Sequence, residues 1–288
     1  MRKAEVSIII SVFEQLEYTK RCLEALEHSL SGIIEYEVLI IDDCSEDGTV
    51  DFLKKLKYPY RVFFNSIQKG FAKNNNLAAS QATGRYLCFL NNDVFVEGDW
   101  LLPMINVFKE KEGVGVVGNV QKLAFSNRFD HMGVVFGPQG NPRHYGQWFK
   151  KRRFKGEVKK WSAVTAACCL VEKKAFHTSG CFDEIYINGC EDVDLCLRFN
   201  REGLSNYIVH DSVVLHVKGA SEGRKTFNDQ NSELLLKRWK SQIRLKEAID
   251  DQILHAENYI YRGLIRPFST NLWKWIEAVL IYFRLKRL

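Results

Sequence analysis

The sequence predicts an α/β protein with a mostly parallel central sheet, helices on both sides of it, and a helical C-terminal extension. Three observations lead to this prediction. Strand and helix patterns alternate through the first hundred residues, the apolar runs end in polar residues, and the pattern is helical from about Asn228 onwards. Strands that alternate with helices in this way form parallel sheets with right-handed crossovers.

The elements of the first half follow from hydrophobic period and turn residues. Short apolar runs with β-branched and aromatic residues predict strands, at 6–12, 36–41, 60–64 and 86–90. Segments with amphipathic spacing predict the helices between them, at 18–30, from Asp47-Gly48-Thr49 onwards, and at 71–82. Each strand is thus followed by a helix, as a parallel sheet requires.

The second half is less regular. A helix at 99–110 and a strand at 114–120 are followed by 122–160, which is rich in Gly, Asn, Arg and aromatic residues and has no long period. We expect an irregular insertion there, in which loops carry specificity. Regular structure returns in elements that we predict at 162–172, 191–201 (a helix), 207–209 and 213–216.

Composition and charge exclude several classes of protein. Of the 288 residues, 46% are hydrophobic and 26% are charged, which allows a sizeable core and argues against disorder. The net charge of +6 is mild, and the basic clusters at 150–153, 159–160 and the last five positions suit a phosphate-bearing ligand or an anionic membrane surface. No nucleic-acid-binding motif occurs, so nucleic acid is not an expected partner.

The cysteines and the chain start bear on the expected compartment. Eight cysteines show no CxxC spacing, and several lie in apolar runs, so we interpret them as small buried hydrophobic residues in a reducing cytosol. The first strand begins almost at once, which predicts no signal peptide. No apolar run reaches about 18 residues, so no spanning helix is expected. The predicted location is therefore cytoplasmic.

The segment 272–285 is unusually apolar for a helix outside a core. Lys274, Glu277 and Arg284 share one stripe, and Trp and aliphatic residues cover most of the rest. A Trp-rich helix flanked by basic residues can lie in a membrane interface, or it can pack on the domain or on a second subunit. Peripheral contact with the inner face of the plasma membrane and dimerisation therefore stay open, and with them the oligomeric state.

Polar residues gather where strands end, which is where open α/β sheets bind ligands. Asn91-Asn92-Asp93 follows the strand at 86–90; a turn would explain it in part, because Asn and Asp are favoured in turns. Asp42 and Asp43 follow the second strand, and two adjacent carboxylates repel unless something uses them. A uracil- or thymine-like N–H or a ribose hydroxyl suits such acceptors.

A second acidic group opens the helix at 191–201. The helix dipole stabilises carboxylates in a first turn, which accounts for Asp194. Glu191 and Asp192 follow a Gly-containing loop at 187–190 and fit that explanation less well. His216 ends the last predicted strand, and a polar segment follows it. A lone His is usually structural or on the surface, so the roles of these residues stay open at this point.

Together these motifs resemble inverting glycosyltransferases of family 2, which have the GT-A fold. Over roughly the first 220 residues, the matching segments are 6–13, IDDCSEDGT at 41–49, GFAKNNN at 70–76, FLNND at 89–93, GCFDE at 180–184, EDVDLCLR at 191–198 and His216. Within the family, the chain resembles the rhamnosyltransferase-like branch, which builds bacterial surface polysaccharides. The resemblance implies a GT-A catalytic domain over 1–225 (a nucleotide-binding half at about 1–120 and an acceptor-binding half at about 121–225) and a C-terminal helical extension over 226–288.

The resemblance also implies a metal site. Asn91-Asn92-Asp93 stands where the family has its DxD motif, with Asn in place of the first Asp, so Asp93 would carry the metal and His216 would be the second protein ligand. Mixed oxygen and nitrogen ligation suits Mn²⁺ somewhat better than Mg²⁺. Asn91 and Asn92 would shape the loop and meet the sugar or the ribose.

The remaining implied roles concern the donor and the chemistry. The donor, a UDP- or dTDP-linked sugar, would be held by Ser11, Phe13, Glu14, Asp42, Asp43, Lys73, Asn75, Asn91 and Asn92, although Glu14 replaces an Asn that is common in the family. Asp192 would deprotonate the hydroxyl of a glycan or lipid-linked glycan acceptor, so that one displacement inverts the anomeric carbon. Glu191 is the second choice for this base.

Two other functions are compatible with parts of the pattern. A sugar nucleotidyltransferase would have a Gly-rich basic loop after the first strand, where this chain has Val12-Phe13-Glu14-Gln15. A non-catalytic nucleotide-sugar-binding homologue would have no need of a base together with a metal site, yet Asp93, Asp192 and His216 are all present. The sequence does not identify the sugar, the nucleotide base or the acceptor.

Overall fold

The structure is a computed structural model, and it describes residues 4–219 and 226–286. Its strands are β1 (Val6–Val12), β2 (Tyr36–Asp42), β3 (Tyr60–Phe64), β4 (Tyr86–Leu90), β5 (Val94–Val96), β6 (Val114–Leu123), β7 (Phe129–His131), β8 (Val134–Phe136), β9 (Pro142–His144), β10 (Val158–Trp161), β11 (Cys168–Glu172) and β12 (Ser205–His216). Its helices are α1 (Leu16–Leu30), α2 (Thr49–Leu53), α3 (Phe71–Gln81), α4 (Leu102–Glu110), α5 (Lys173–Thr178), α6 (Glu191–Arg201), α7 (Asn228–Gln242), the π-helical η1 (Ile243–Glu247), α8 (Ala248–Asp250), α9 (Gln252–Ile265), the 3₁₀ turn η2 (Pro267–Ser269) and α10 (Leu272–Tyr282).

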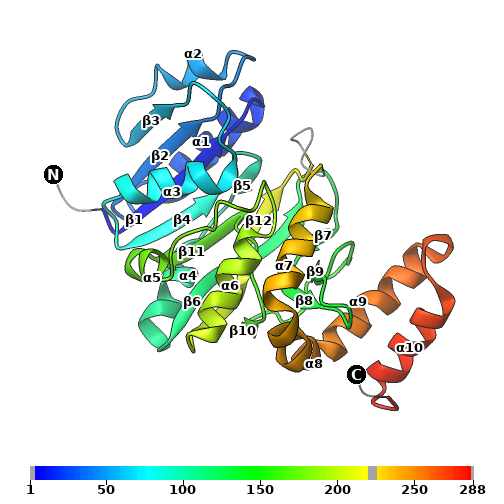
Figure 1. Cartoon of the computed structure of the whole chain (residues 1–288). Coiled ribbons are helices and arrows are strands. Elements are labelled where there is room, and N and C mark those ends of the chain that lie inside the picture. The colour runs from blue at the N-terminus through cyan, green and yellow to red at the C-terminus, as the bar shows by residue number, and fades with distance from the viewer. Residues whose placement is uncertain (1–3, 220–225, 287–288) are drawn as a thin grey trace.

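The centre of the molecule is one ten-stranded sheet with helices on both faces (Figure 1). The strand order is β10-β12-β6-β11-β4-β1-β2-β3, with β5 paired to β12 and β7 to β6. Strands β3, β2, β1 and β4 are parallel to one another. Strand β11 enters antiparallel between β4 and β6, and β12 then runs parallel to β6. This architecture confirms the predicted fold class.

Strand β1 shows why its sequence is apolar throughout. Ile8 and Ile10 belong to the core on the face that α1 and α4 cover, whereas Ile9 belongs to the core with α3 and α6. All three side chains are fully buried. A strand buried on both faces loses the apolar–polar alternation that one exposed face would impose.

The segment 122–160 contains more regular structure than its sequence pattern predicts. It contributes β7 and β10 to the main sheet, and β8 and β9 form a separate two-stranded sheet. Helix α9 packs against β8 and the loop after β9: the Phe136 amide donates to Asp251 Oδ2 at 2.8 Å, and the Tyr145 hydroxyl to Glu257 Oε2 at 2.5 Å. These strands are three or four residues long, too short for a readable period.

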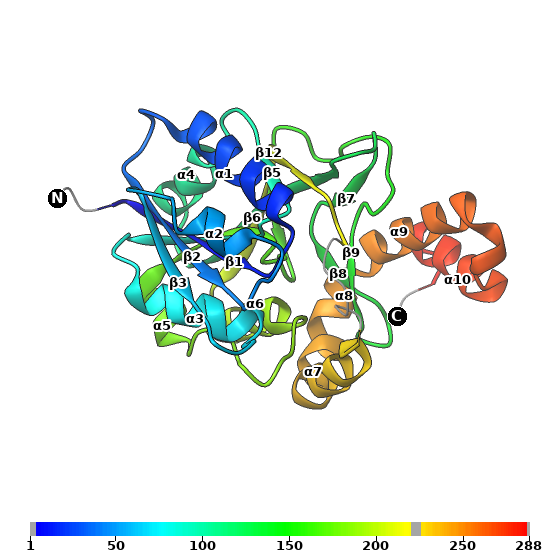
Figure 2. The ribbon, with the colours of Figure 1, turned by 90° about the horizontal axis from the view of Figure 1, so that it is seen from above.

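The C-terminal helices occupy one end of the molecule (Figure 2). Helix α7 packs beside α6, whereas α9 and α10 form a hairpin that projects on the side away from β1, β2 and β3. The expected boundary at 225/226 adjoins 220–225, which lies outside the described residues, as does part of the polar segment after His216. Among the helices described, none is both long and apolar enough to cross a membrane.

Candidate active site

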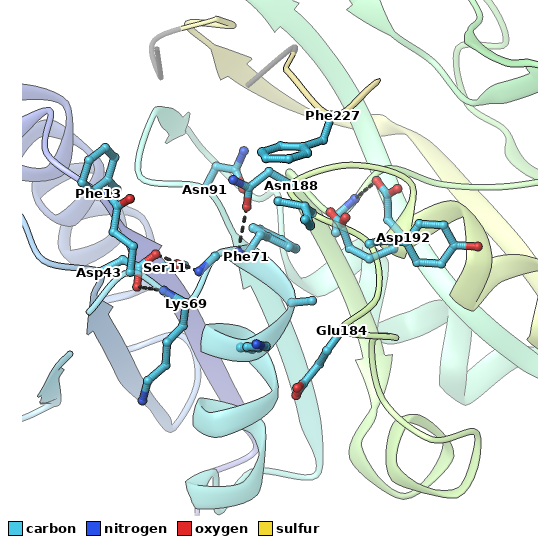
Figure 3. Close-up of a pocket in the computed structure, with 18 of the residues that line it drawn as sticks. Ser11, Phe13, Asp43, Lys69, Phe71, Asn91, Glu184, Asn188, Asp192 and Phe227 are labelled. Carbon is cyan, nitrogen blue, oxygen red and sulfur yellow. Dashed lines mark hydrogen bonds between the residues drawn. The ribbon is translucent and has the colours of Figure 1, made fainter. Parts of the chain in front are cut away.

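A cavity of about 620 Å³ opens at the carboxyl ends of β1 and β4 (Figure 3). Figure 3 shows Ser11, Phe13 and Asp43 on one side of it and Asp192 on the other. Nine of the sequence-predicted residues line it, namely Ser11, Phe13, Asp43, Lys73, Asn91, Asn92, Asp93, Glu191 and Asp192. The other four, Glu14, Asp42, Asn75 and His216, are not among its lining residues. Nine of the thirteen predicted residues thus border one cavity.

The adjacent carboxylates after β2 have different surroundings. Asp43 faces the cavity, but its Oδ1 accepts hydrogen bonds from Asn65 Nδ2 (2.9 Å) and the Lys69 amide (2.8 Å), and its Oδ2 accepts one from the Gly70 amide (2.9 Å). Asp42 is buried, and its Oδ2 accepts from the Ser45 amide at 3.2 Å. Asp43 therefore fixes the loop that leads into α3 while its side chain borders the cavity.

The other residues behind this wall hold the loops together. The Glu14 amide donates to Ser45 Oγ at 2.7 Å, so Glu14 contributes its backbone there. Asn74 Nδ2 donates to Ser11 Oγ at 3.2 Å, whereas Asn75 Nδ2 donates to the Phe71 carbonyl of its own helix at 2.8 Å. Sequence reasoning selected Asn75 from this run of asparagines, but in the structure it is the neighbouring Asn74 that bonds to Ser11.

The turn Asn91-Asn92-Asp93 is held from behind. Asn92 Nδ2 donates to Thr19 Oγ1 on α1 at 3.0 Å, and the Asn91 amide donates to the Ala167 carbonyl at 2.9 Å. Burial, followed by the charge of Asp93, raises the pKa of the Cys22 thiol, whose Sγ donates to the Asn91 carbonyl at 3.7 Å. These contacts hold the backbone of the turn that carries Asp93.

The sequence-predicted metal ligands come together through a strand that sequence reasoning missed. Short β5 follows the turn and pairs antiparallel with β12, which places Val94 opposite His216. The Val217 amide also donates to the Asp93 carbonyl at 3.0 Å. As a result His216 Nε2 lies 3.3 Å from Asp93 Oδ1, and both side chains are buried.

Gln121 on β6 orients His216. Its Oε1 lies 3.0 Å from His216 Nδ1, and in the neutral tautomer in which Nδ1 donates to Gln121, Nε2 keeps a lone pair. Nε2 is buried without a hydrogen-bond partner, although it faces the Asp93 carboxylate. Two lone-pair donors that face each other fit a cation. Residues 4–219 and 226–286 hold no cluster of three or more His, Cys, Asp or Glu side chains suited to a metal, so the protein part of such a site would be this pair.

The carboxylates of α6 diverge in the first helical turn. Asp192 borders the cavity, where its Oδ2 accepts from the Ala166 amide (3.0 Å) and its Oδ1 from the Val193 amide (2.8 Å). Glu191 is buried, and its Oε2 accepts from the Gly189 amide at 2.7 Å. Asp194 is fully buried beneath them and binds Arg198, Arg238, Tyr186 and Trp239. Glu191 and Asp192 both line the cavity, and Asp192 is the less buried of the two.

One wall of the cavity comes from residues without a recognisable sequence signal. Asn188 Oδ1 accepts from the Phe71 amide at 2.9 Å, so the loop before α6 touches the start of α3. Asn231 on α7 holds that loop by both backbone groups of Ile187, accepting from its amide at 3.2 Å and donating to its carbonyl at 2.8 Å. Phe227, at the start of α7, also lines the cavity. A left-handed Asn188 (φ 52°) hints at a tight loop, but no local pattern reveals its partner.

Comparison with known proteins identifies the family. The model of "Glycosyl transferase family 2" matches residues 7–180. The chain belongs to glycosyl transferase family 2. It is 33% identical over 164 residues to the O-antigen biosynthesis protein RfbC of Myxococcus xanthus (51% of this chain, 12% of RfbC). It is 26% identical over 258 residues to an uncharacterized protein of Sinorhizobium fredii (82% of this chain, 28% of that protein). The family 2 glycosyltransferase chain thus spans a minor part of either relative.

Solved structures support the GT-A fold. The chain is similar to GalNAc-T7 with UDP, GalNAc and Mn²⁺ (TM-score 0.63, 16% identity, 75% of this chain and 44% of that chain). It is also similar to the mannosyltransferase PcManGT from Pyrobaculum calidifontis in complex with GDP-Man and Mn²⁺ (TM-score 0.59, 16% identity, 98% of this chain and 74% of that chain). At this identity the similarity shows the fold of the glycosyltransferase and leaves its substrates open.

Proposed function

We propose that this glycosyltransferase moves a sugar from a nucleoside diphosphate donor to a hydroxyl of a glycan or lipid-linked glycan acceptor, with inversion, in the assembly of a bacterial surface polysaccharide. The observation that carries the proposal is the pairing of Asp93 with His216 next to a cavity that Asp192 also lines. The similarity to RfbC, an O-antigen biosynthesis protein, supports the polysaccharide assignment. We infer a cytoplasmic location, which agrees with eight free thiols.

The donor would occupy the side of the cavity formed by 1–120. Ser11, Phe13 and Asp43 would border the nucleoside, and Lys73 and Asn91 the phosphates or the sugar. A divalent cation, when bound, supplies charge neutralisation for the departing diphosphate. Asp93 Oδ1 and His216 Nε2 would hold it, and Gln121 keeps the lone pair of His216 directed at that position. Mn²⁺ in both similar structures supports this assignment.

Asp192 would act as the base toward the acceptor. Its two backbone amide donors fix the carboxylate without neutralising it, so it can take the proton of an attacking hydroxyl. Glu191, whose Oε2 accepts from the Gly189 amide, would position the loop before α6. The loop at 184–188 and Phe227 would border the acceptor. We further infer that the catalytic unit extends beyond residue 225 and includes α7, because α7 supports this wall through Asn231.

A thermal-shift panel of UDP-, dTDP- and GDP-sugars, with Mn²⁺ or with EDTA, tests the donor and the metal together. A ligand that binds the folded state raises the melting temperature, so one nucleotide class should stabilise the chain only when Mn²⁺ is present. Asp93→Asn should abolish that increment, and Asp99→Asn, an exposed neighbour, should keep it. Equal stabilisation in EDTA would contradict the metal assignment. Including dTDP-rhamnose tests the rhamnosyltransferase-like branch, which stays a prediction.

Single-turnover transfer assays test the base. Asp192→Asn should slow transfer by roughly 10²–10⁴-fold while the thermal shift with donor is kept, because a general base acts in the chemical step. Unchanged turnover would remove Asp192 from the role and turn attention to Glu191→Gln. Donor stabilisation with no transfer to any glycan would favour the non-catalytic homologue. The anomeric configuration of the product, read by NMR, checks inversion.

A further inference from the structure

The outer face of α10 is apolar and exposed. Its side chains recur at helical spacing and so share one face: Leu272 (66% exposed), Trp273 (78%), Ile276 (38%), Leu280 (37%) and Phe283 (66%). We call these five residues the α10 stripe. At the turn of the hairpin, Phe268 is fully exposed and Leu264 is 68% exposed. Apolar surface therefore continues from the stripe to the tip.

The stripe is not the face by which α10 packs on the protein. The opposite side of the helix carries Ala278 and Ile281, which are buried against α9. Trp275 Nε1 donates to the Ile260 carbonyl at 3.2 Å, and a Cβ on Gly263 would lie 2.2 Å from the Trp275 ring, so glycine permits the close approach of the two helices. Helices α9 and α10 thus pack against each other through one interface, and the α10 stripe faces away from that interface.

The charge of this segment is mostly positive. Residues 262–288 contain six basic residues and one acidic residue, a net charge of +5, whereas the whole chain carries +6. Two of the basic groups have partners in the structure: Arg266 lies over the Trp148 ring at 4.7 Å, and Lys286 Nζ donates to Glu277 Oε1 at 2.5 Å. Lys274 and Arg284 are both exposed. Aromatic and aliphatic residues flanked by cations match the boundary between acyl chains and anionic headgroups.

A second copy of the chain fits this face less well than a lipid surface does. A helix of 11 residues is about 16 Å long and about 10 Å wide, so its face offers on the order of 200 Å², against about 800 Å² per partner in a stable protein–protein interface. Pairing two stripes would also bring two segments of charge +5 together. An anionic bilayer reverses the sign of that electrostatic contribution.

We propose that the α9–α10 hairpin docks the protein on an anionic lipid bilayer, with the α10 stripe and Phe268 in the headgroup–acyl boundary and the basic residues at the lipid phosphates. This inference goes beyond the proposed function and does not rest on it. Docking would hold the enzyme at the surface where a lipid-linked acceptor lies. The docking proposal is tested by lipid binding, so a negative transfer assay would not affect its test.

Vesicle co-sedimentation of the full chain tests the proposal. Vesicles of phosphatidylcholine with about 30% phosphatidylglycerol should bind the chain at least tenfold more strongly than pure phosphatidylcholine, because each basic residue near such a surface contributes roughly fivefold. High salt should weaken the binding. The double variant Trp273→Ser/Phe283→Ser should lose at least tenfold in binding, and Lys274→Glu/Arg284→Glu should lose the preference for anionic lipid.

Matched controls separate docking from general stickiness. Tyr58→Ser/Ile67→Ser removes two equally exposed apolar side chains from a distant surface, and should leave vesicle binding unchanged. Circular dichroism checks that each variant is folded, which is expected because every changed residue is exposed. Sedimentation velocity tests whether the α10 stripe instead binds a second copy of the chain. The proposal would be overturned if the parent chain is a dimer that Trp273→Ser/Phe283→Ser dissociates and if it binds both vesicle types equally and weakly.

Discussion

Helices α7 and α10 lie in the same C-terminal segment but have different relations to the rest of the molecule. Helix α7 is bound to the catalytic part by buried polar contacts: Trp239 Nε1 donates to Asp194 Oδ1 at 2.7 Å, and Asn231 holds both backbone groups of Ile187. Helix α10 packs on α9 and leaves its apolar stripe exposed. The sequence pattern predicts helices in both segments and marks 272–285 as unusually apolar.

Buried polar partners distinguish α7 from α10 more sharply than hydrophobicity does. The fully buried Asp194 accepts hydrogen bonds from Trp239 and Arg238 on α7 and from Arg198 on its own helix, so losing one of these partners would weaken the compensation of a buried charge. No side chain of the α10 stripe carries such a constraint. We infer that α7 is part of the transfer machinery and that α10 serves location. Four predictions test that division.

The largest expected effect is on stability, and it compares two tryptophans. Trp239 on α7 is 4% exposed, whereas Trp273 on α10 is 78% exposed. Trp239→Ala should lower the free energy of unfolding by about 3–5 kcal/mol, because it leaves a cavity and removes one of the hydrogen-bond donors to the buried Asp194. Trp273→Ala should change it by about 0.5 kcal/mol or less. Urea unfolding followed by circular dichroism measures both, and equal losses would contradict the division.

The next effect concerns Asp251, which joins the base of α9 to β8. Burial raises the pKa of Asp251 to about 7, and its Oδ2 accepts from the Phe136 amide. At pH values between the pKa of Asp251 in the unfolded chain and its pKa in the folded protein, the folded state keeps a proton that the unfolded state has lost. The contribution of Asp251 to the free energy of unfolding is therefore highest at low pH and falls as the pH rises toward 7. The expected loss between pH 5 and pH 7 is about 2 kcal/mol.

The variant Asp251→Asn isolates that effect. An amide oxygen still accepts from the Phe136 amide but does not titrate, so the stability difference between pH 5 and pH 7 should shrink by the same amount. Asp250→Asn, the exposed neighbour, should keep the pH dependence of the parent chain. Chemical unfolding at the two pH values gives the comparison, and a parent chain that is equally stable at both would refute the assignment.

Two asparagines provide the third comparison, at the level of catalysis. Asn231 holds Ile187 beside the cavity, and Asn258 on α9 holds the loop after β9 in a similar way, accepting from the Gly146 amide and donating to the His144 carbonyl at 3.1 Å each. Asn231→Ala should lower kcat/KM for the acceptor by about tenfold, since the loop loses two hydrogen bonds of about 1 kcal/mol each. Asn258→Ala should leave kcat/KM within about twofold if only its own loop responds. A loss of kcat/KM in Asn258→Ala and not in Asn231→Ala would place the acceptor site near the loop after β9 instead.

The sequence was sufficient for those parts of the fold and of the candidate site that local pattern encodes. Strands β1 and β4 are continuous apolar runs, and the motifs at their ends line the cavity as expected from strand-end chemistry. In each case a few neighbouring residues contain the whole signal.

Contacts between distant segments could not be predicted in the same way. Strand β5 is three residues long, yet its pairing with β12 brings His216 to Asp93. Gln121 gives no sign in the sequence that it orients His216, and Asn231 gives none that it holds Ile187. Such contacts depend on the packing of elements far apart in the chain, which hydrophobic period does not encode.

The smallest expected effect on catalysis comes from removing α10 altogether. A chain that ends at Thr270 keeps α9 and its contacts with the body, including the 2.5 Å bond from Tyr145 to Glu257. Its kcat/KM on a short soluble acceptor should stay within about twofold of the parent, because no residue of α10 lines the cavity. Binding to anionic vesicles should fall to the background level. Transfer and sedimentation assays on one preparation measure both quantities. Two results would show that catalysis and location are not divided between α7 and α10. One is a truncated chain that still sediments with vesicles, and the other is a truncated chain that loses transfer while its helical circular dichroism persists.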